Sequence, residues 1–153
     1  MNTMKKVILI SAGDPNSIST EITIKAIENS KINKNVKPIV VSNSKLIEDC
    51  KKVIKSNIQL NEIEDKVNFS DFKENHLNII TIKIPDNVIL EEQNIKYASF
   101  IKNSIITCVK TEMGSIASAI VTNPINKKMM YNSGFKFQGH TDFLASLSKN
   151  KKN

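Results

Sequence analysis

Apolar and polar positions follow two different patterns along this chain. Short apolar runs without a polar face, such as residues 5–11 (KKVILIS) and 37–43 (KPIVVSN), are typical of buried strands in parallel sheets. Longer segments, in which apolar residues recur at helical spacing, alternate with them. The predicted strands centre on residues 7–10, 39–41, 79–82 and 120–121. The predicted helices cover residues 19–29, 44–56, 94–113, 126–131 and a segment from about 141 onward.

This alternation predicts an α/β fold, with a mainly parallel sheet and helices on both faces. Residues 57–76 are polar and mixed, and there we expect a strand followed by an irregular excursion. Ser19 or Thr20 is the expected N-cap of the first helix. The helix at 44–56 has one predicted apolar face, formed by Leu46, Ile47, Cys50, Val53 and Ile54.

Charge and cysteine content narrow the class of protein only a little. The chain has 153 residues and a formal net charge of +7, but its lysines are interspersed with acidic residues and no nucleic-acid-binding motif accompanies them. The apolar run after the N-terminal lysines is too short for a signal peptide, and no stretch approaches the length of a membrane span. Cys50 and Cys108 are far apart and read as reduced thiols. These features predict a cytoplasmic protein that does not enter a membrane.

Three polar loops follow apolar strands, which is where α/β sheets bind ligands. They are SAGDPNSISTE (11–21), VTNPINKK (121–128) and the segment GFKFQGHT (134–141). Each loop taken alone also has a purely structural interpretation. Asp14 suits a turn or a helix cap, and Asn126 and Lys127 suit a helix start with a solvated lysine. A single histidine before a helix, here His140, is often a cap or a surface residue.

Taken together and in this order, the three loops resemble the 4-hydroxythreonine-4-phosphate dehydrogenase family of vitamin B6 biosynthesis. The shared motifs are Gly-Asp-Pro at 13–15 with Glu21 following, Thr-x-Pro-Ile-Asn-Lys at 122–127, and Gly-His-Thr-Asp-Phe-Leu-Ala at 139–145. The resemblance extends over essentially the whole chain. It implies the N-terminal half of a fold like that of isocitrate and isopropylmalate dehydrogenases.

The resemblance also implies which residues meet the substrate, a small phosphorylated hydroxy-amino acid. His140 and Thr141 are the main substrate-binding candidates, and Lys127, Asn126 and Asp14 are weaker ones. An imidazole and a hydroxyl at a helix start can hydrogen-bond an anionic ligand, and the free amides of that helix start favour negative charge. The family oxidises 4-phosphooxy-L-threonine with NAD and a divalent metal (Zn, Mg or Co), and loss of carbon dioxide follows.

Two departures from the family pattern qualify this interpretation. The family usually reads Gly-Asp-Pro-Ala-Gly-Ile-Gly-Pro-Glu, whereas this chain has Asn16, Ser17, Ser19 and Thr20, and Asn123 also replaces a glycine. Family members are much longer, so residues 1–153 correspond to the N-terminal part of the dehydrogenase and the C-terminal half is absent. In the family that half supplies three metal-binding histidines and most of the cofactor site. His76 matches none of those ligands, so the chain itself offers no metal ligands and no assigned catalytic residue.

We therefore expect an NAD-dependent dehydrogenase by resemblance, whose 153 residues alone are inactive. The expected partners are a second copy in a homodimer or a separate C-terminal half. One alternative is a non-catalytic module that binds a phosphorylated ligand, or an inactive relic of the enzyme. Another is a basic nucleic-acid-binding protein, which rests on charge alone.

Overall fold

The computed structural model describes residues 6–29, 32–33, 35–64, 66–85, 95–113 and 116–149. The ends of two predicted elements, at residues 5 and 94, lie outside these ranges, as does the end of the lysine-rich tail.

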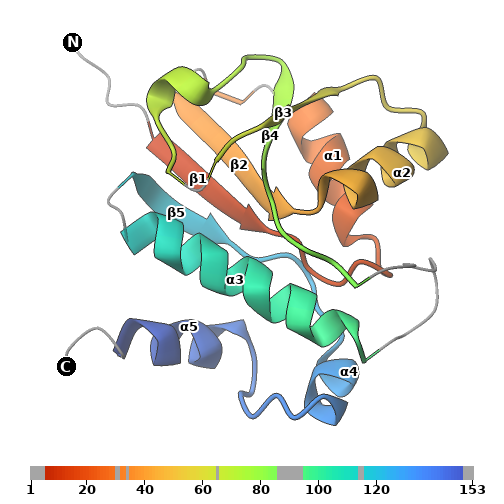
Figure 1. Cartoon of the computed structure of the whole chain (residues 1–153), viewed down its shortest axis with the longest axis vertical. Helices are drawn as coiled ribbons and strands as arrows, with labels where there is room; N and C mark the ends of the chain where they lie inside the picture. Colours follow the sequence, from red (N-terminus) through yellow and green to blue (C-terminus); the bar gives the residue numbers. More distant parts are fainter. Residues whose placement is uncertain are drawn as a thin grey trace.

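All five strands of the sheet run parallel, in the order β3-β4-β2-β1-β5 (Figure 1). Every predicted strand is confirmed, and the polar stretch after residue 57 contributes a further short one. The strands are β1 (Lys6–Ser11), β2 (Val36–Ser42), β3 (Gln59–Glu62), β4 (His76–Thr81) and β5 (Ala117–Val121). A 3-10 turn (Phe69–Asp71) lies within the irregular excursion between β3 and β4.

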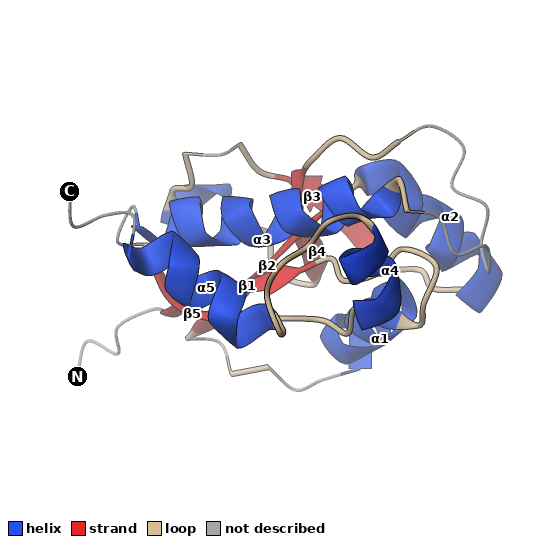
Figure 2. Cartoon of the chain, turned by 90° about the horizontal axis from the view of Figure 1, so that it is seen from below, coloured by secondary structure: helices blue, strands red, loops and turns tan. Residues whose placement is uncertain are grey.

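The helices lie on both faces of this sheet, as predicted (Figures 1 and 2). On one face lie α1 (Ser19–Asn29) and α2 (Ser44–Ile54), and on the other α3 (Tyr97–Met113), with α4 (Lys127–Asn132) and α5 (His140–Lys149) packed near it. Most apolar residues of β1, β2 and β4 are buried and the others are half-buried, because both faces of the sheet are covered. Ile24 and Ile47 pack on one side of the sheet and Cys108 on the other.

Two details of the helices differ from the prediction. Val53 was expected on the apolar face of α2 but is 68% exposed. It lies about 100° around the helix from Ile54, and this places it at the edge of the apolar face, next to solvent. Ser19 is already the first residue of α1, and its hydroxyl donates to the Pro124 carbonyl at 3.0 Å instead of capping the helix. The prediction missed this because the acceptor lies 105 residues away in the sequence.

A buried hydroxyl group joins α3 to the sheet by hydrogen bonds. The Ser104 side chain of α3 is fully buried, accepts from the Ala12 backbone N–H at 2.8 Å and donates to the Val41 carbonyl at 2.6 Å. These two bonds satisfy backbone groups at the carboxyl ends of β1 and β2, where the strand ladder stops. The helix therefore meets the sheet next to the loops that carry the candidate site.

Candidate functional site

The loops after β1 and β5 lie side by side at the carboxyl edge of the sheet, because these two strands are neighbours. From β1 the chain passes to α1 on one face, and from β5 it passes to α4 and α5 on the other (Figures 1 and 2). Such a point, where adjacent connections leave to opposite faces, is the usual ligand-binding position of open α/β sheets. Two of the three motif loops meet there.

Direct hydrogen bonds fasten these two loops together. The Asp14 backbone N–H donates to the Pro124 carbonyl at 3.1 Å, and the Ser19 hydroxyl donates to the same oxygen at 3.0 Å. Gly13, with φ +72°, allows this approach, because a Cβ there would lie 2.8 Å from that carbonyl oxygen. The Gly-Asp-Pro turn is therefore shaped by contact with the Thr-Asn-Pro loop.

Asn123 is the centre of this contact, although the sequence marks it only as a departure from the family pattern. Its amide nitrogen donates to the Ser11 carbonyl at 2.8 Å and to the Thr23 hydroxyl at 2.7 Å. Its backbone N–H also lies 3.3 Å from the Ser11 hydroxyl, and all three residues are buried. Asn123 thus joins β1, α1 and the loop after β5, a structural role that its neighbours in sequence do not reveal.

The serines that replace family glycines in the first loop adopt ordinary backbone conformations. Among the described residues, the left-handed φ values belong to Gly13, Gly134, Lys55 and Asn75, and not to Ser17 or Ser19. The two serine hydroxyls instead bond each other at 2.7 Å. The loop therefore accommodates these substitutions without backbone strain.

Asp14 takes part in the turn itself. It is 4% exposed, and its Oδ1 accepts the Asn16 backbone N–H at 2.9 Å. Its carbonyl accepts the backbone N–H of Ser17 at 3.1 Å and the hydroxyl of the same residue at 2.8 Å. These bonds are those of an Asx-type turn and agree with the structural interpretation of this residue.

Asn126 and Lys127 form the start of α4. The Asn126 Oδ1 accepts the Met129 backbone N–H at 3.0 Å and so caps the helix. Lys127 is the first helical residue and is exposed. The cap fixes the direction in which the lysine leaves the loop.

His140 is the first residue of α5, and the charge of Lys127 reaches it. The pKa of the His140 imidazole is lowered, first by burial and second by the positive charge of Lys127. Its Nε2 atom is buried and has no hydrogen-bond partner among the described residues. Thr141 follows as an exposed residue. The Lys127 charge thus acts on His140, and a shared ligand site that includes both residues stays a prediction.

An aromatic cluster holds the segment before α5 in place. The rings of Phe135, Phe137 and Phe143 have centroids 5.1–5.3 Å apart, and the Phe135–Phe143 pair meets edge to face. The Tyr131 hydroxyl donates to the Gln138 carbonyl at 3.2 Å and so ties α4 to the same segment. Packing of these rings, and not the polar motif alone, therefore positions His140.

The described residues contain neither a cluster of metal ligands nor a glycine-rich phosphate loop. Within those ranges, no three His, Cys, Asp or Glu side chains gather as metal ligands. His76 is the first residue of β4 and lies at the amino edge of the sheet, whereas His140 follows the loops at the carboxyl edge. The three described glycines, Gly13, Gly134 and Gly139, lie in two separate segments, so they form no glycine-rich phosphate loop.

Both cysteines are free thiols, as expected. Burial raises the pKa of Cys108 to about 12. Within the described part of the chain, no helix is both long enough and apolar enough to span a bilayer.

The geometry defines a doubly wound α/β unit with a loop site at its switch point, and comparison with known proteins gives the family. Residues 34–153 match the family model described as pyridoxal phosphate biosynthetic protein PdxA. The chain belongs to this family, and the resemblance drawn from its motifs is thereby confirmed.

Named relatives agree with this assignment. The 4-hydroxythreonine-4-phosphate dehydrogenase of Wigglesworthia glossinidia brevipalpis is 36% identical over 80 residues, which are 50% of this chain and 23% of the relative. The enzyme of the same name from Maricaulis maris is 40% identical over 68 residues, or 44% of this chain and 20% of the relative. The aligned segments thus cover less than a quarter of these relatives.

Solved structures of the same enzyme share the fold. The crystal structure of the Burkholderia phymatum protein superposes with a TM-score of 0.83 at 22% identity, covering 94% of this chain and 44% of that one. The Klebsiella pneumoniae protein gives 0.83 at 23% identity, with 95% and 45% covered. This chain therefore has the isocitrate/isopropylmalate dehydrogenase-like fold over less than half the length of these proteins.

Proposed function

We propose that this chain forms one wall of the substrate site of a 4-hydroxythreonine-4-phosphate dehydrogenase, the wall that binds the phosphorylated substrate. The observation that carries the proposal is the half-buried His140 at the start of α5, whose Nε2 has no hydrogen-bond partner among the described residues. The family match over residues 34–153 supports it, because it includes both Lys127 and His140. The ligand is a small phosphorylated hydroxy-amino acid, the substrate class printed in the relatives' names.

Each candidate residue has a distinct part in this proposal. Lys127 provides a positive charge for the phosphate, and the first backbone amides of α5 add donors. His140, whose pKa is lowered, is neutral at pH 7 and offers its buried Nε2 to a ligand hydroxyl or phosphate oxygen. The exposed Thr141 hydroxyl can complete the contact. Asn126 and Asp14 hold the two loops in shape and stay the weaker candidates for contact with the ligand.

Binding to the chain alone tests this wall directly. We expect 4-phosphooxy-L-threonine to shift the NMR signals of His140 and its neighbours in the labelled chain. Lys127→Gln and His140→Gln should each weaken binding about tenfold, the loss of one charge-assisted hydrogen bond. His76→Gln is the matched control, because that histidine lies at the other edge of the sheet. Equal affinity in the wild type and the Lys127 and His140 variants would overturn the proposal.

We further propose that oxidation depends on NAD, a divalent metal and residues beyond these 153. The described residues hold no set of metal ligands, and the solved relatives extend over more than twice the matched length. The complete enzyme would be a cytoplasmic oxidoreductase of vitamin B6 synthesis that forms homodimers, as the family resemblance implies. In this proposal the 153 residues correspond to its N-terminal part.

An NADH-formation assay tests this second part. The purified chain should give no NADH with substrate, NAD and a divalent metal. Activity should appear when the C-terminal portion of a full-length relative is supplied as a separate polypeptide. Turnover by the 153 residues alone would refute the requirement for further residues.

A non-catalytic ligand-binding module is the second candidate. The observation that favours it is the hydrogen-bonded closure of the β1 and β5 loops through Asn123, at a position where the family usually has glycine. In that case phosphate-ligand binding persists, and no added portion of a relative restores NADH formation.

A further inference from the structure

The outer strand β5 is open along one side. It closes one end of the five-stranded sheet, so β1 pairs with one of its sides and no strand of the described residues pairs with the other. The backbone N–H and C=O groups that point away from β1 are therefore free to pair with a further strand. The side chains leave room for it, because Ser118, Ala119 and Val121 are exposed.

One face of the sheet is also uncovered at this end. In the parallel register, Ile8 lies beside Ala119. Ile10 lies beside Val121 in the same way, so these side chains form an apolar row on a single face. It is the face of α1, because Ile10 packs against the cluster that contains Ile24. Ile8 and Ile10 are only half-buried, and Val121 is 48% exposed, so α1 leaves this row largely uncovered.

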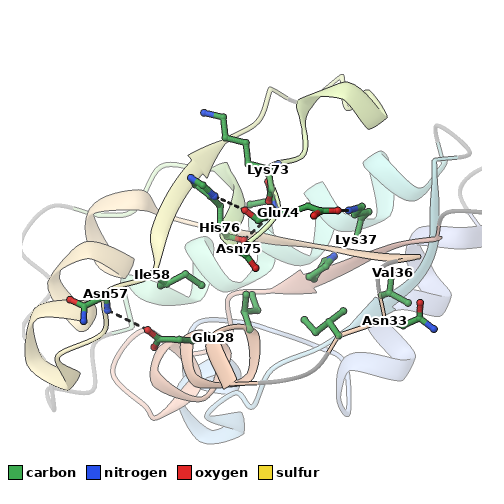
Figure 3. Close-up of a pocket in the computed structure, with 14 residues that line it drawn as sticks. Glu28, Asn33, Val36, Lys37, Asn57, Ile58, Lys73, Glu74, Asn75 and His76 are labelled. Carbon is green, nitrogen blue, oxygen red and sulfur yellow. Dashed lines mark hydrogen bonds and ion pairs between the residues drawn. The ribbon is translucent and has the colours of Figure 1, made fainter.

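The opposite edge of the sheet is protected. The exposed residues of β3 are Gln59 and Glu62, and charged side chains are a usual means of preventing a further strand from pairing. The segment before β3 is held to α1, since the Asn57 backbone N–H donates to Glu28 Oε1 at 3.3 Å (Figure 3). Ile58, beside it, is buried on the α1 face. β5, with the sequence ASAIV, has no charged residue to protect its edge.

The course of the chain favours a further strand beside β5. In Figures 1 and 2, α5 ends on the side of the molecule where β5 begins. A strand that follows α5 would therefore start next to the start of β5 and run parallel to it. Because α4 and α5 lie on the α3 face, this connection would proceed in the same direction, and over the same face, as the one from β4 through α3 to β5. Parallel strands are almost always joined with that one, right-handed sense.

We propose that the open edge and the apolar row bind the C-terminal portion of a dehydrogenase of this family, which adds a parallel strand to β5. The inference rests on the proposed requirement for residues beyond these 153. The length of the relatives supports it, because this chain covers 44% of the Burkholderia phymatum protein and more than half of that protein has no counterpart here. Backbone hydrogen bonds would provide affinity, and the apolar row would be covered by side chains of the added portion.

Hydrogen exchange followed by mass spectrometry tests this inference. The tagged chain is purified alone and after co-expression with the C-terminal portion of the Klebsiella pneumoniae relative. In the complex, the outward amides of residues 117–121 should exchange at least about tenfold more slowly than in the chain alone, whereas those of β3 should not change. A complex in which β5 is not protected would overturn the inference. If the two pieces do not co-purify, that portion is joined after Asn153 in one polypeptide, where unprotected β5 amides have the same meaning.

NADH formation is measured on the same samples, so that the two proposals can fail separately. Protected β5 amides without NADH formation would support the docking site and contradict the proposed function. NADH formation without this protection would do the reverse. A chain that forms a dimer by itself, with β5 already protected, would show that a second copy covers the edge, and would overturn the inference.

Two lysine substitutions form a matched pair, since each adds one positive charge at an exposed position of an outer strand. Ala119→Lys should weaken association about tenfold or more, because its charge lies on the face that the added portion would bury. Gln59→Lys, on β3, should leave the affinity unchanged. Equal affinities of the two variants would contradict the docking site.

Discussion

The side-chain amide of Asn123 donates a hydrogen bond to the Ser11 backbone carbonyl at 2.8 Å, and so fixes the loop after β5 against the end of β1. The same amide nitrogen reaches the Thr23 hydroxyl of α1 at 2.7 Å. A single side chain therefore connects three elements at the switch point of the sheet. Its contribution can be measured separately from that of the Gly13 turn beside it.

Asn123→Ala should lower the free energy of unfolding by about 1–3 kcal/mol, because it leaves buried polar groups of Ser11 and Thr23 without this donor. Urea unfolding followed by circular dichroism measures the change. Asn132→Ala, at the exposed end of α4, is the matched control and should change little. A double-mutant cycle with Thr23→Val should show coupling; strictly additive effects would contradict the described bond.

Gly13→Ala should destabilise the chain by about 2–4 kcal/mol through two combined effects. The residue has φ +72°, and an added Cβ would lie 2.6 Å from Ser19 Oγ and 2.7 Å from Asn123 Cβ. Gly134→Ala isolates the first effect, since its φ is +84° but no atom lies within 4 Å of the new Cβ. That variant should lose about 1 kcal/mol.

Gly139→Ala has neither problem and serves as the baseline of the glycine series, because its added Cβ also meets nothing within 4 Å. Thermal or urea unfolding of the three variants should rank Gly13 as the most sensitive position and Gly139 as the least. A Gly13 variant as stable as the Gly139 variant would mean that the two loops do not approach as described.

The apolar pattern of the sequence predicts the sheet well because each central strand is covered on both faces. Runs such as VILI in β1 have no polar side to confuse them with surface strands. The order of the strands is harder to predict from the sequence. The chain leaves β4, passes through α3 and returns as β5 on the far side of β1, and no local sequence pattern specifies this crossover. Val53 shows a further limit of the sequence pattern. Helical spacing places it near the apolar face of α2, but spacing alone does not show how far that face is covered.

The candidate site is predictable in part for a similar reason. Motif spacing identifies His140 and Lys127, but the position of His140 depends on the packing of Phe135 against Phe143, which motif spacing does not describe. The role of Ser104 was missed, although one signal was available. It is a polar residue on the inward face of α3, between Ile101 and Cys108, and such a residue usually bonds a buried backbone group.

Cys108 should resist thiol reagents in the folded chain at pH 8, because it is fully buried and its pKa is raised to about 12. Cys50 is half-buried, and its pKa is raised by burial and by Glu21, so it should react slowly but first. Reaction with 5,5′-dithiobis(2-nitrobenzoic acid) should therefore show two phases. In Cys50→Ala the remaining phase should follow global unfolding in urea; rapid labelling of Cys108 in native buffer would show that α3 does not pack on the sheet.

The pKa of His140 should lie below the ordinary histidine value of about 6.5, and Lys127→Gln should raise it only part of the way back. Burial is the larger cause of the lowering, so removing the lysine charge leaves a residual shift. An NMR titration of the imidazole Cε1 proton measures both values. Lys128→Gln removes a neighbouring charge from α4 and is the control that should leave the titration unchanged.

The same shift fixes the sign of a pH effect on stability. Because the folded ring binds its proton more weakly than the unfolded one, protonation favours the unfolded chain. The stability associated with a neutral His140 should therefore be complete above the unfolded pKa and decline as pH falls through it toward the folded value. In His140→Gln this part of the decline should disappear, whereas His76→Gln should keep it. A wild type and a His140→Gln variant with parallel stability curves between about pH 5 and 7 would show that the ring is not held neutral in the fold.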